Sequence, residues 1–577
     1  MSGTLANPTS TPPANLRTVQ TGPFRWRIRN NLLDVLLNER GLRLPEWIES
    51  GQAQIVKKGP HRIVYRVNLP ELSFYIKHNL LHNYRAWLRQ LVRPSKARTE
   101  HEQISELNSR GIPTLEPLGF GERTDGLTSG ESYLITKSLN DTQQLDDFLE
   151  RTLPTFPTTE QTAIRQQIAT SLGQFVARLH ETGVSHQDFH CGNILLRWQH
   201  GQAHLYLIDL QAVRLQRSLS WSERQTNLVI LNRWLSLRSN RTERCRFWKA
   251  YLEVLGTSLE SETARGLAKS IEQKTRDSNL FFWQRRDRRC RFRNRRYSLI
   301  RRRPFRGYNV TDLDKADVES ILRDPDVFFR DPNRKILKES KSVKVIEIQV
   351  RVAGRDIPAV FKRVEVRRWS DPLASLFRWT PALRSWVYGH GLRERGLPTA
   401  RPLMVFHRMK WGMATQGYLL MEKVPNSGDV RDLISSLESC KHHQRLLRRR
   451  IQQLAWLIRT LHDRGLTHRD LKTPNILVSN ETEELSRTSS PFCFIDLVGL
   501  SRVKNPGWEL RAKNLVRLAV CFLEDPRVTR TDKLRFLRAY LSWDLQAGTS
   551  WKRWWRAIQE GMLRKVERNR QLGRPLV

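Results

Sequence analysis

The sequence has little of what marks secreted, membrane-spanning or disulfide-bonded proteins. No apolar run approaches the roughly 18 residues that a transmembrane helix needs, and the best candidate, LVRLAVCFL, is interrupted by Arg517. The beginning of the chain lacks the apolar core of a signal peptide. The 6 cysteines are scattered and form no CxxC pair. These absences predict a cytoplasmic protein that is not secreted and has no transmembrane helix.

The chain is also poor in acidic residues. Its 58 Asp and Glu face 99 Lys and Arg, which gives a formal net charge of +41. Such an excess is typical of proteins that meet polyanions, such as nucleic acid, anionic lipid headgroups or phosphorylated glycans. The hydrophobic fraction of 39%, with 18 Trp and 21 Phe, is nevertheless sufficient for folded cores. A length of 577 residues predicts two large domains or more.

Three motifs occur twice in the same order along the chain. The pairs are RGIPTLEPL and RGLPTARPL (110–118, 395–403), VSHQDFHCGNILL and LTHRDLKTPNILV (184–196, 466–478), and LIDLQAV and FIDLVGL (207–213, 494–500). Their offsets of 285, 282 and 287 residues drift by only a few positions. A solenoid repeat is far shorter, so the sequence predicts a duplicated domain of roughly 270 residues.

The border between the repeats is predicted near an arginine-rich run. Residues 285–307 hold twelve Arg and a single acidic residue, Asp287. Apolar side chains are interleaved with them, so a polyanion-facing surface is as good an interpretation as a solvated linker. The expected organisation is a disordered tail (1–22), a first domain (23–284), an Arg-rich linker (285–310) and a second domain (311–577).

Each HxD loop lies between a predicted helix and a short strand. Apolar residues recur at helical intervals over 158–182, Thr158 and Gln161 have the spacing of a capping box, and Gly183 ends the helix. The second copy repeats the pattern and ends at Gly465. A short strand, NILL or NILV, follows each loop, and another β-rich run then ends in Ile-Asp-Leu. Helix, polar loop, hairpin and strand-end Asp together favour phosphoryl transfer.

Phosphoryl transfer explains the residue types in this pattern. The reaction needs a carboxylate to orient the acceptor hydroxyl, oxygen ligands for Mg²⁺ and a cation on the phosphates. Asp188 and Asp470 suit the first role. Lys77 and Lys362, each on an apolar strand 111 or 108 residues before the aspartate, suit the last. The oxygen ligands predicted for Mg²⁺ are Asn193, Asp209, Asn475 and Asp496.

With these motifs in order, both halves resemble the protein-kinase-like superfamily, with HxDxxxxN as the catalytic loop and IDL where protein kinases have DFG. FYIKHN, HQDFHCGNILL and LIDLQAV more narrowly resemble the lipopolysaccharide core kinase (Kdo/WaaP, InaA-type) family, over roughly residues 25–280 and 315–560. The resemblance implies an α+β fold of two tandem bilobal kinase-like domains. Each would have a small β-rich N-lobe and a helical C-lobe.

The resemblance also implies a function and partners. The protein would be an ATP- and Mg²⁺-dependent kinase for a lipopolysaccharide core sugar, Kdo or heptose, on a lipid-linked glycan, with no nucleic acid partner. It would be cytoplasmic and peripheral on the inner membrane, where residues 285–306 would face an anionic surface. Glu100, eleven residues before Gly111, would pair with Lys77. Lys472 would contact the γ-phosphate, as in Ser/Thr kinases.

Departures from the kinase pattern leave two other functions open. Neither half has a GxGxxG loop, and no Ala-Pro-Glu follows either IDL, which argues against a peptide-docking platform. HRDLK at 468–472 nevertheless favours a Ser/Thr protein kinase. The basic excess favours a tandem pseudokinase scaffold that binds polyanions.

The two halves are also predicted to be unequal. Ser385 stands at the 285-residue offset from Glu100, so the second lysine lacks the expected carboxylate partner. We therefore expect the first half to carry most of the catalysis. The alternative is that Glu365 or Glu394 substitutes for the missing glutamate, and the well-formed HRDLK loop argues for the second half.

Overall fold

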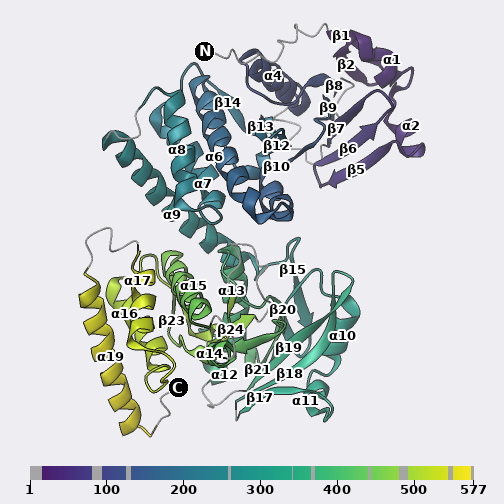
Figure 1. Cartoon of the computed structure of the whole chain (residues 1–577). Coiled ribbons are helices and arrows are strands. Elements are labelled where there is room, and N and C mark those ends of the chain that lie inside the picture. Colours follow the sequence, from purple (N-terminus) through teal and green to yellow (C-terminus); the bar gives the residue numbers. More distant parts are fainter. Residues whose placement is uncertain are drawn as a thin grey trace. The chain divides into compact units, whose positions relative to one another are not determined.

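The duplicated motifs lie in two separate units of the chain, Met1–Thr275 and Arg276–Val577, as seen in a computed structural model (Figure 1). Each unit is an α+β bilobal domain with a β-rich N-lobe and a helical C-lobe, which confirms the predicted fold class. The structure describes residues 16–80, 94–124, 131–257, 262–340, 342–365, 371–438, 443–479, 491–542 and 550–573. Within these ranges, no helix has the length and apolarity needed to cross a bilayer.

A seven-stranded antiparallel sheet forms the first N-lobe. In spatial order its strands are β1 (Leu16–Thr21), β2 (Phe24–Arg29), β8 (Pro117–Arg123), β9 (Ser132–Lys137), β7 (Ser73–Asn79), β6 (Arg62–Asn68) and β5 (Ala53–Lys58). Helix α4 (Lys96–Ser109) packs on β8 and β9, and the short helices α1 (Leu33–Leu36) and α2 (Leu44–Glu49) add to the core. Phe74 and Ile76 of β7 are buried, whereas Lys77 lies on the opposite face, as the alternation of a strand requires.

The second N-lobe repeats this sheet strand for strand. Its spatial order is β15 (Tyr297–Arg302), β16 (Phe305–Val310), β20 (Pro402–Lys410), β21 (Met413–Glu422), β19 (Arg355–Glu365), β18 (Val343–Val352) and β17 (Ile336–Ser340). Helix α13 (Pro381–Glu394) takes the place of α4 and packs on β20 and β21. The helices α10 (Lys315–Arg323) and α11 (Val327–Arg330) precede β17. The shared strand order supports the tandem duplication independently of the motifs.

The C-lobes consist of helices around the HxD loops. The first contains α6 (Thr158–Glu181), α7 (Trp221–Leu235), α8 (Arg241–Val254) and the start of α9 (Glu262–Arg289). The second contains α14 (Val430–Glu438), α15 (His443–Asp463), α16 (Trp508–Val520), α17 (Arg530–Tyr540) and α19 (Trp551–Gln571). Gly183 has φ of 74° after α6, and a Cβ there would lie 2.0 Å from the Gln216 carbonyl oxygen, so only glycine fits.

Two local predictions from the sequence are wrong. Helix α6 begins after Pro157, and Thr158 makes no cap; the Gln161 amide donates instead to the Phe156 carbonyl at 2.8 Å. Residues 1–15 of the expected tail lie outside the described residues, but residues 16–21 form strand β1, paired with β2 along its full length. The burial of β1 is slight, so no apolar alternation marked it in the sequence.

The arginine-rich segment, expected to be a linker over 285–310, is built into the second unit. It contains the last turn of α9 and the strands β15 and β16, and β16 pairs with β20 inside the sheet. Tyr297, Ile300 and Phe305, whose apolar side chains favoured a polyanion-facing surface, are buried in the N-lobe core. The boundary between the two units falls within α9, after Thr275.

Asp287, the single acidic residue of that segment, makes buried ion pairs that attach the segment to the rest of the second unit. The Asp287 carboxylate is 3% exposed and accepts two hydrogen bonds from the Arg395 guanidinium, at 2.8 and 2.9 Å. Arg502 forms a second ion pair with it, at 2.9 Å. Next to it, the Trp386 indole donates to the Cys290 carbonyl at 2.9 Å. Both interactions attach the end of α9 to α13.

We expect Asp287→Ala to lower the free energy of unfolding of the second unit by about 3–5 kcal/mol, because it leaves Arg395 buried without its partner. Urea unfolding followed by circular dichroism measures the change. Glu560→Ala is the control: Glu560 is exposed and its pair with Arg564 spans 3.8 Å, so its loss should cost less than about 1 kcal/mol. Equal effects of the two substitutions on the free energy of unfolding would contradict the role of Asp287 in holding α9 to α13.

Candidate active site

A buried histidine holds the HxD loop against the strand-end aspartate. In the first unit, β11 (Val184–His186) pairs with β14 (Val213–Leu215). The His186 Nδ1 accepts a hydrogen bond from the Asp188 N–H at 3.2 Å, and its Nε2 donates to the Asp209 carbonyl at 3.2 Å. Burial lowers the pKa of His186, which keeps the ring neutral and able to make both bonds. The loop backbone is thereby fixed by the fold.

The predicted catalytic and metal-binding side chains surround this histidine. The Asn193 amide nitrogen donates to the Asp188 carbonyl at 2.9 Å, and the N–H of Ile208 donates to the Asn193 carbonyl at 3.0 Å. Asp209 follows with φ of 59°, a left-handed conformation that is uncommon for non-glycine residues. The Asp188 side chain is 67% exposed and therefore accessible to an acceptor. The structure brings the three predicted residues into one loop cluster.

The donor chemistry of this cluster fits Mg²⁺ rather than a soft metal. Among the described residues there is no group of three or more His, Cys, Asp or Glu that could hold a metal ion by itself. Because the Asn193 nitrogen is committed to a hydrogen bond, its amide oxygen is the atom left to face a cation. One amide oxygen and one carboxylate, completed by phosphate oxygens, is the ligand set that Mg²⁺ prefers.

A buried ion pair connects the N-lobe to the loop after Asp209. Lys77 of β7 bonds to Glu100 of α4, as the family resemblance implied, and Glu100 is 0% exposed. The other Glu100 oxygen accepts a hydrogen bond from the Gln211 amide at 2.9 Å. Gln211 lies two residues after Asp209. A strand, a helix and the strand-end loop therefore meet at one carboxylate.

The second unit repeats the loop closely. The Asp470 N–H donates to His468 Nδ1 at 3.1 Å, and the Asn475 amide donates to the Asp470 carbonyl at 2.8 Å. Asp496 again has a left-handed φ, of 51°. The Lys472 Nζ lies 3.4 Å from the Asp470 carboxylate, where the first unit has His190 at 3.6 Å from Asp188.

The ion pair of the first unit is absent from the second. Helices α4 and α13 begin after capping residues 285 positions apart, Ser95 and Thr380, so Ser385 does occupy the place of Glu100. Ser385 is buried, and the Lys362 Nζ lies 3.5 Å from Asp496 instead. The proposed substitutes are engaged elsewhere: Glu365 pairs with Arg363 at 2.9 Å and Glu394 with Arg296 at 2.9 Å.

Three site residues were missed by the sequence analysis. Gln211 binds Glu100, and the guanidinium of Arg62, the first residue of β6 after the Gly-poor turn, lies 3.6 Å from the Asp209 carboxylate. Lys565 of α19 has a pKa lowered by burial and then by the neighbouring charges of Arg517 and Lys472. Arg62 and Lys565 belong to no motif, and nothing in the LIDLQAV motif indicates that its Gln211 binds Glu100. Only the fold brings the three residues to the site. Lys565 is more than ninety residues from Asp470 along the chain.

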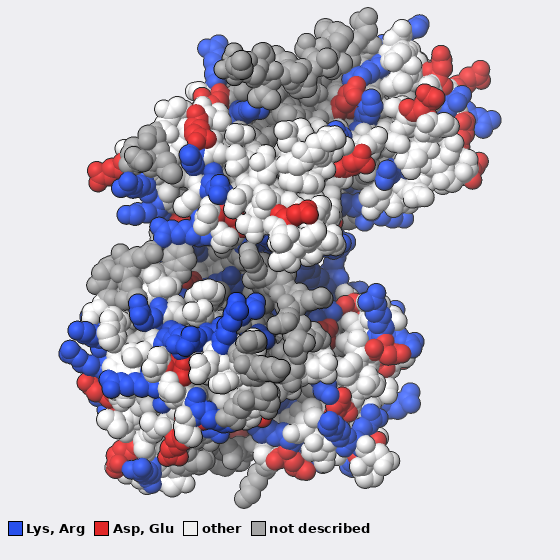
Figure 2. All heavy atoms as spheres, in the orientation of Figure 1, with Lys and Arg blue, Asp and Glu red and all other residues white. Residues whose placement is uncertain are grey.

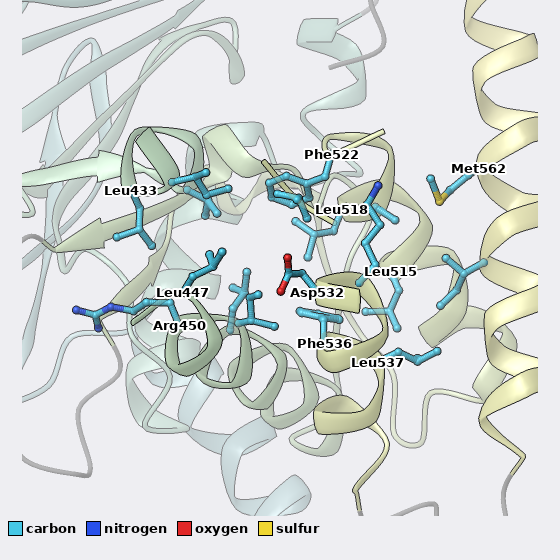
Figure 3. A pocket seen from close by; sticks show the side chains of 18 of the residues that line it. Leu433, Leu447, Arg450, Leu515, Leu518, Phe522, Asp532, Phe536, Leu537 and Met562 are labelled. Atoms are coloured by element: carbon cyan, nitrogen blue, oxygen red, sulfur yellow. The ribbon is translucent and has the colours of Figure 1, made fainter. Parts of the chain in front are cut away.

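A separate apolar cavity lies in the second C-lobe. It has a volume of about 110 Å³ and is lined from α14, α15, α16, α17 and α19, with Leu433, Leu447, Leu518 and Phe536 pointing toward it (Figure 3). Asp532, which also lines it, has its carboxylate satisfied by Thr529 and Arg535. No residue of the HxD loop lines the cavity. It therefore belongs to the C-lobe core and not to the candidate active site.

The sequence profile of the lipopolysaccharide kinase (Kdo/WaaP) family matches residues 47–251 and 372–540, together more than half of the chain. A 3-deoxy-D-manno-octulosonic acid kinase of Mannheimia succiniciproducens is 28% identical over 134 residues, 23% of this chain and 51% of that protein, so the match spans about half of its length. The lipopolysaccharide core heptose(I) kinase WaaP of Pseudomonas aeruginosa is 22% identical over 220 residues, 36% of this chain and 79% of that protein. A solved structure described as WaaP in complex with acyl carrier protein aligns with a TM-score of 0.33 at 21% identity, covering 45% of this chain and 98% of that one.

The histidines behind the loops predict acid sensitivity. Burial lowers the pKa of His462 to about 3, and its ring bonds to the Tyr540 hydroxyl at 2.7 Å and to Asn514 at 3.2 Å. The unfolded chain binds a proton near pH 6.5, whereas the folded ring stays neutral. Stability is therefore unaffected above that pH and is lost as the pH falls below it. We expect His462→Gln to reduce the fall in the free energy of unfolding between pH 6 and 5, as measured by urea unfolding at each pH. An unchanged fall would contradict a neutral His462.

Proposed function

The chain belongs to the lipopolysaccharide kinase (Kdo/WaaP) family, and from that premise we propose that it is an ATP-dependent phosphotransferase acting on a core sugar of lipopolysaccharide, Kdo or heptose. The acceptor is a hydroxyl group of a lipid-linked glycan. The observation that carries the proposal is the Lys77–Glu100 ion pair beside a preformed HxD loop in the first unit. A kinase site needs this lysine in place and the loop aspartate accessible before phosphoryl transfer.

The position and chemistry of each residue in the first unit suit it to a different role in phosphoryl transfer. Asp188 is exposed, so it orients the acceptor hydroxyl and takes its proton. Lys77 is held by Glu100 on the N-lobe side, where it contacts the phosphates. Arg62, the first residue of β6 and next to Asp209, adds a cation where a glycine-rich loop would otherwise supply backbone amides.

Asn193 and Asp209 are the residues that would hold Mg²⁺ in the first unit, and Asn475 and Asp496 those of the second. When bound, the ion neutralises charge on the transferring phosphoryl group and orients its oxygens. The left-handed backbone at Asp209 and Asp496 presents each carboxylate at its strand end. Lys362, 3.5 Å from Asp496, competes for the same carboxylate in the second unit.

We assign most of the catalysis to the first unit. Its Lys77 has a dedicated carboxylate partner, whereas Lys362 shares the carboxylate that would bind the metal. The second unit keeps the loop residues and adds Lys472 near Asp470, which supports binding of a phosphorylated ligand there. This retained loop is also the observation that favours a second candidate, a Ser/Thr protein kinase activity of the second unit.

An anionic membrane surface is proposed as the place of action, because the acceptor is lipid-linked. The basic excess is concentrated in the second unit, where residues 276–577 hold 64 Lys and Arg against 32 Asp and Glu, compared with 35 against 26 in 1–275. Figure 2 shows Lys and Arg side chains spread widely over this unit on the face drawn. Arg301 and Arg302 of the arginine-rich segment are exposed and free of core packing, which suits contact with lipid phosphates.

We expect Asp188→Ala to lower phosphate transfer from ATP to core glycolipid by at least about a hundredfold, because the acceptor hydroxyl loses its base. Asp470→Ala, the matched change in the second loop, should keep most of the activity. Radiolabelled ATP measures both. If Asp470→Ala loses activity and Asp188→Ala keeps it, the second unit and not the first carries most of the catalysis. Transfer to a generic protein in place of glycolipid would favour the protein kinase alternative.

We also expect Asp209→Asn combined with Asp496→Asn to abolish the Mg²⁺-dependent part of ATP binding, because each substitution removes a charged oxygen ligand. Calorimetric titration with and without Mg²⁺ measures this part directly. Asp312→Asn, which changes an exposed carboxylate paired with Arg401, is the control and should bind like the parent. An unchanged titration in the double variant would remove the metal assignment.

A further inference from the structure

The two most exposed large apolar side chains among the described residues lie on adjacent segments of the second N-lobe. Phe377 is 89% exposed and Trp411 is 84% exposed. Phe377 follows α12 (Asp371–Ala374), and Trp411 lies in the turn between β20 and β21 (Figure 1). The Ala414 N–H donates to Ser375 Oγ at 3.0 Å, and α12 packs on β21. The two segments are therefore attached to one another.

Trp411 occupies a backbone conformation that a large side chain disfavours. Lys410 pairs with Met413, which leaves Trp411 and Gly412 as a two-residue hairpin loop with φ of 51° and 79°. Such a loop strongly prefers Asn-Gly or Asp-Gly, because both residues need positive φ. The exposed indole gains little packing in return, because it is 84% exposed; the Lys410 Nζ lies 4.8 Å from its ring. A strained, exposed tryptophan is explained by a role outside the fold.

The segment that carries Phe377 is ordered rather than loose. Backbone hydrogen bonds run from Leu376 to Leu373 at 3.1 Å and from Phe377 and Arg378 to Ala374 at 3.1 and 2.8 Å. These turns leave Leu373 49% exposed and Leu376 55% exposed beside Phe377. An ordered backbone thus presents several apolar side chains to the solvent without burying them.

We propose that this apolar surface, formed by Leu373, Leu376, Phe377 and Trp411, docks the protein on an anionic lipid bilayer by entering the boundary between headgroups and acyl chains. Aromatic side chains concentrate at that boundary. The exposed Arg378 and Lys410 adjoin the surface, where they contact lipid phosphates. The proposal rests on the proposed function in one respect, since a lipid-linked acceptor requires the enzyme at a bilayer.

Charge and shape favour a bilayer over a protein partner. The unit that bears the surface has twice as many basic as acidic residues, which complements anionic headgroups. The apolar side chains stand on a hairpin tip and on a short turn, and none of them lines the apolar cavity of the second C-lobe. A protruding apolar ridge flanked by cations suits shallow insertion.

The test is sedimentation of the full chain with vesicles of phosphatidylglycerol and phosphatidylethanolamine, without nucleotide or glycan. The variant is Phe377→Ser with Trp411→Asn. Asn suits the positive φ of the turn, so the variant should melt at the same temperature as the parent or above it. We expect the partition onto vesicles to fall roughly tenfold or more, because two apolar anchors are lost.

The matched control is Phe281→Ser with Trp456→Gln, which removes one Phe and one Trp of 63% and 54% exposure from other surfaces. The control should partition like the parent. Equal partition of the parent and the Phe377–Trp411 variant would overturn the proposal, as would binding that high salt abolishes completely. Self-association that depends on Phe377 and Trp411 without any vesicle binding would also overturn it, in favour of a second copy.

Activity is measured separately, on a glycan acceptor from which the acyl chains have been removed. We expect the Phe377–Trp411 variant to phosphorylate this acceptor at the parent's rate and to be slower only on the vesicle-embedded acceptor. Loss on both acceptors would overturn the docking role. Vesicle binding by a protein that phosphorylates neither acceptor would support docking while refuting the proposed function, so the two proposals fail separately.

Discussion

A carboxylate that has no access to water must be paired, and in the first unit this requirement joins the two lobes. Glu100 is fully buried in α4, and both of its oxygens are committed, one to Lys77 and the other to Gln211. Because Lys77 lies on the N-lobe sheet and Gln211 follows the strand-end Asp209, these elements cannot separate without exposing a bare buried charge. The geometry of Lys77, the proposed phosphate-binding lysine, thus follows from a desolvation constraint.

The second unit meets the same structural need with different chemistry. Ser385 removes the buried charge, and Val498 stands where Gln211 stood. Helix α13 is instead held by arginines: Arg384 donates to the carbonyls of Val498 and Leu500 at 3.2 and 2.7 Å, and Arg395 binds Asp287 at the end of α9. These contacts position the helix but leave Lys362 without a partner of its own, so the fold is kept and Lys362 is less constrained than Lys77.

The fold and the loop residues were predictable because they are local. The HxD spacing, the strand-end aspartates and the lysine alternation of β7 each depend on a few neighbouring residues, and the structure has them together. Predictions failed where long-range packing decides. The arginine-rich strands β15 and β16 bury Tyr297, Ile300 and Phe305 although most of their neighbours are charged, so composition suggested a linker. Arg62 and Lys565 carry no local signal at all, and the LIDLQAV motif does not indicate that its Gln211 binds Glu100.

The duplicated loop also shows why a motif alone does not establish activity. The His186 ring accepts a hydrogen bond from the Asp188 N–H at 3.2 Å, and the His468 ring accepts one from the Asp470 N–H at 3.1 Å, so each histidine side chain satisfies a backbone group of its loop. His180 and His462 bond to Tyr251 and Tyr540 in the same layer. Losing these residues would leave buried polar groups unpaired, whether or not the unit transfers phosphate. Stability therefore accounts for the histidine of the HxD motif in both units, and the evidence that separates the units lies outside the motif, in the exchange of Glu100 for Ser385.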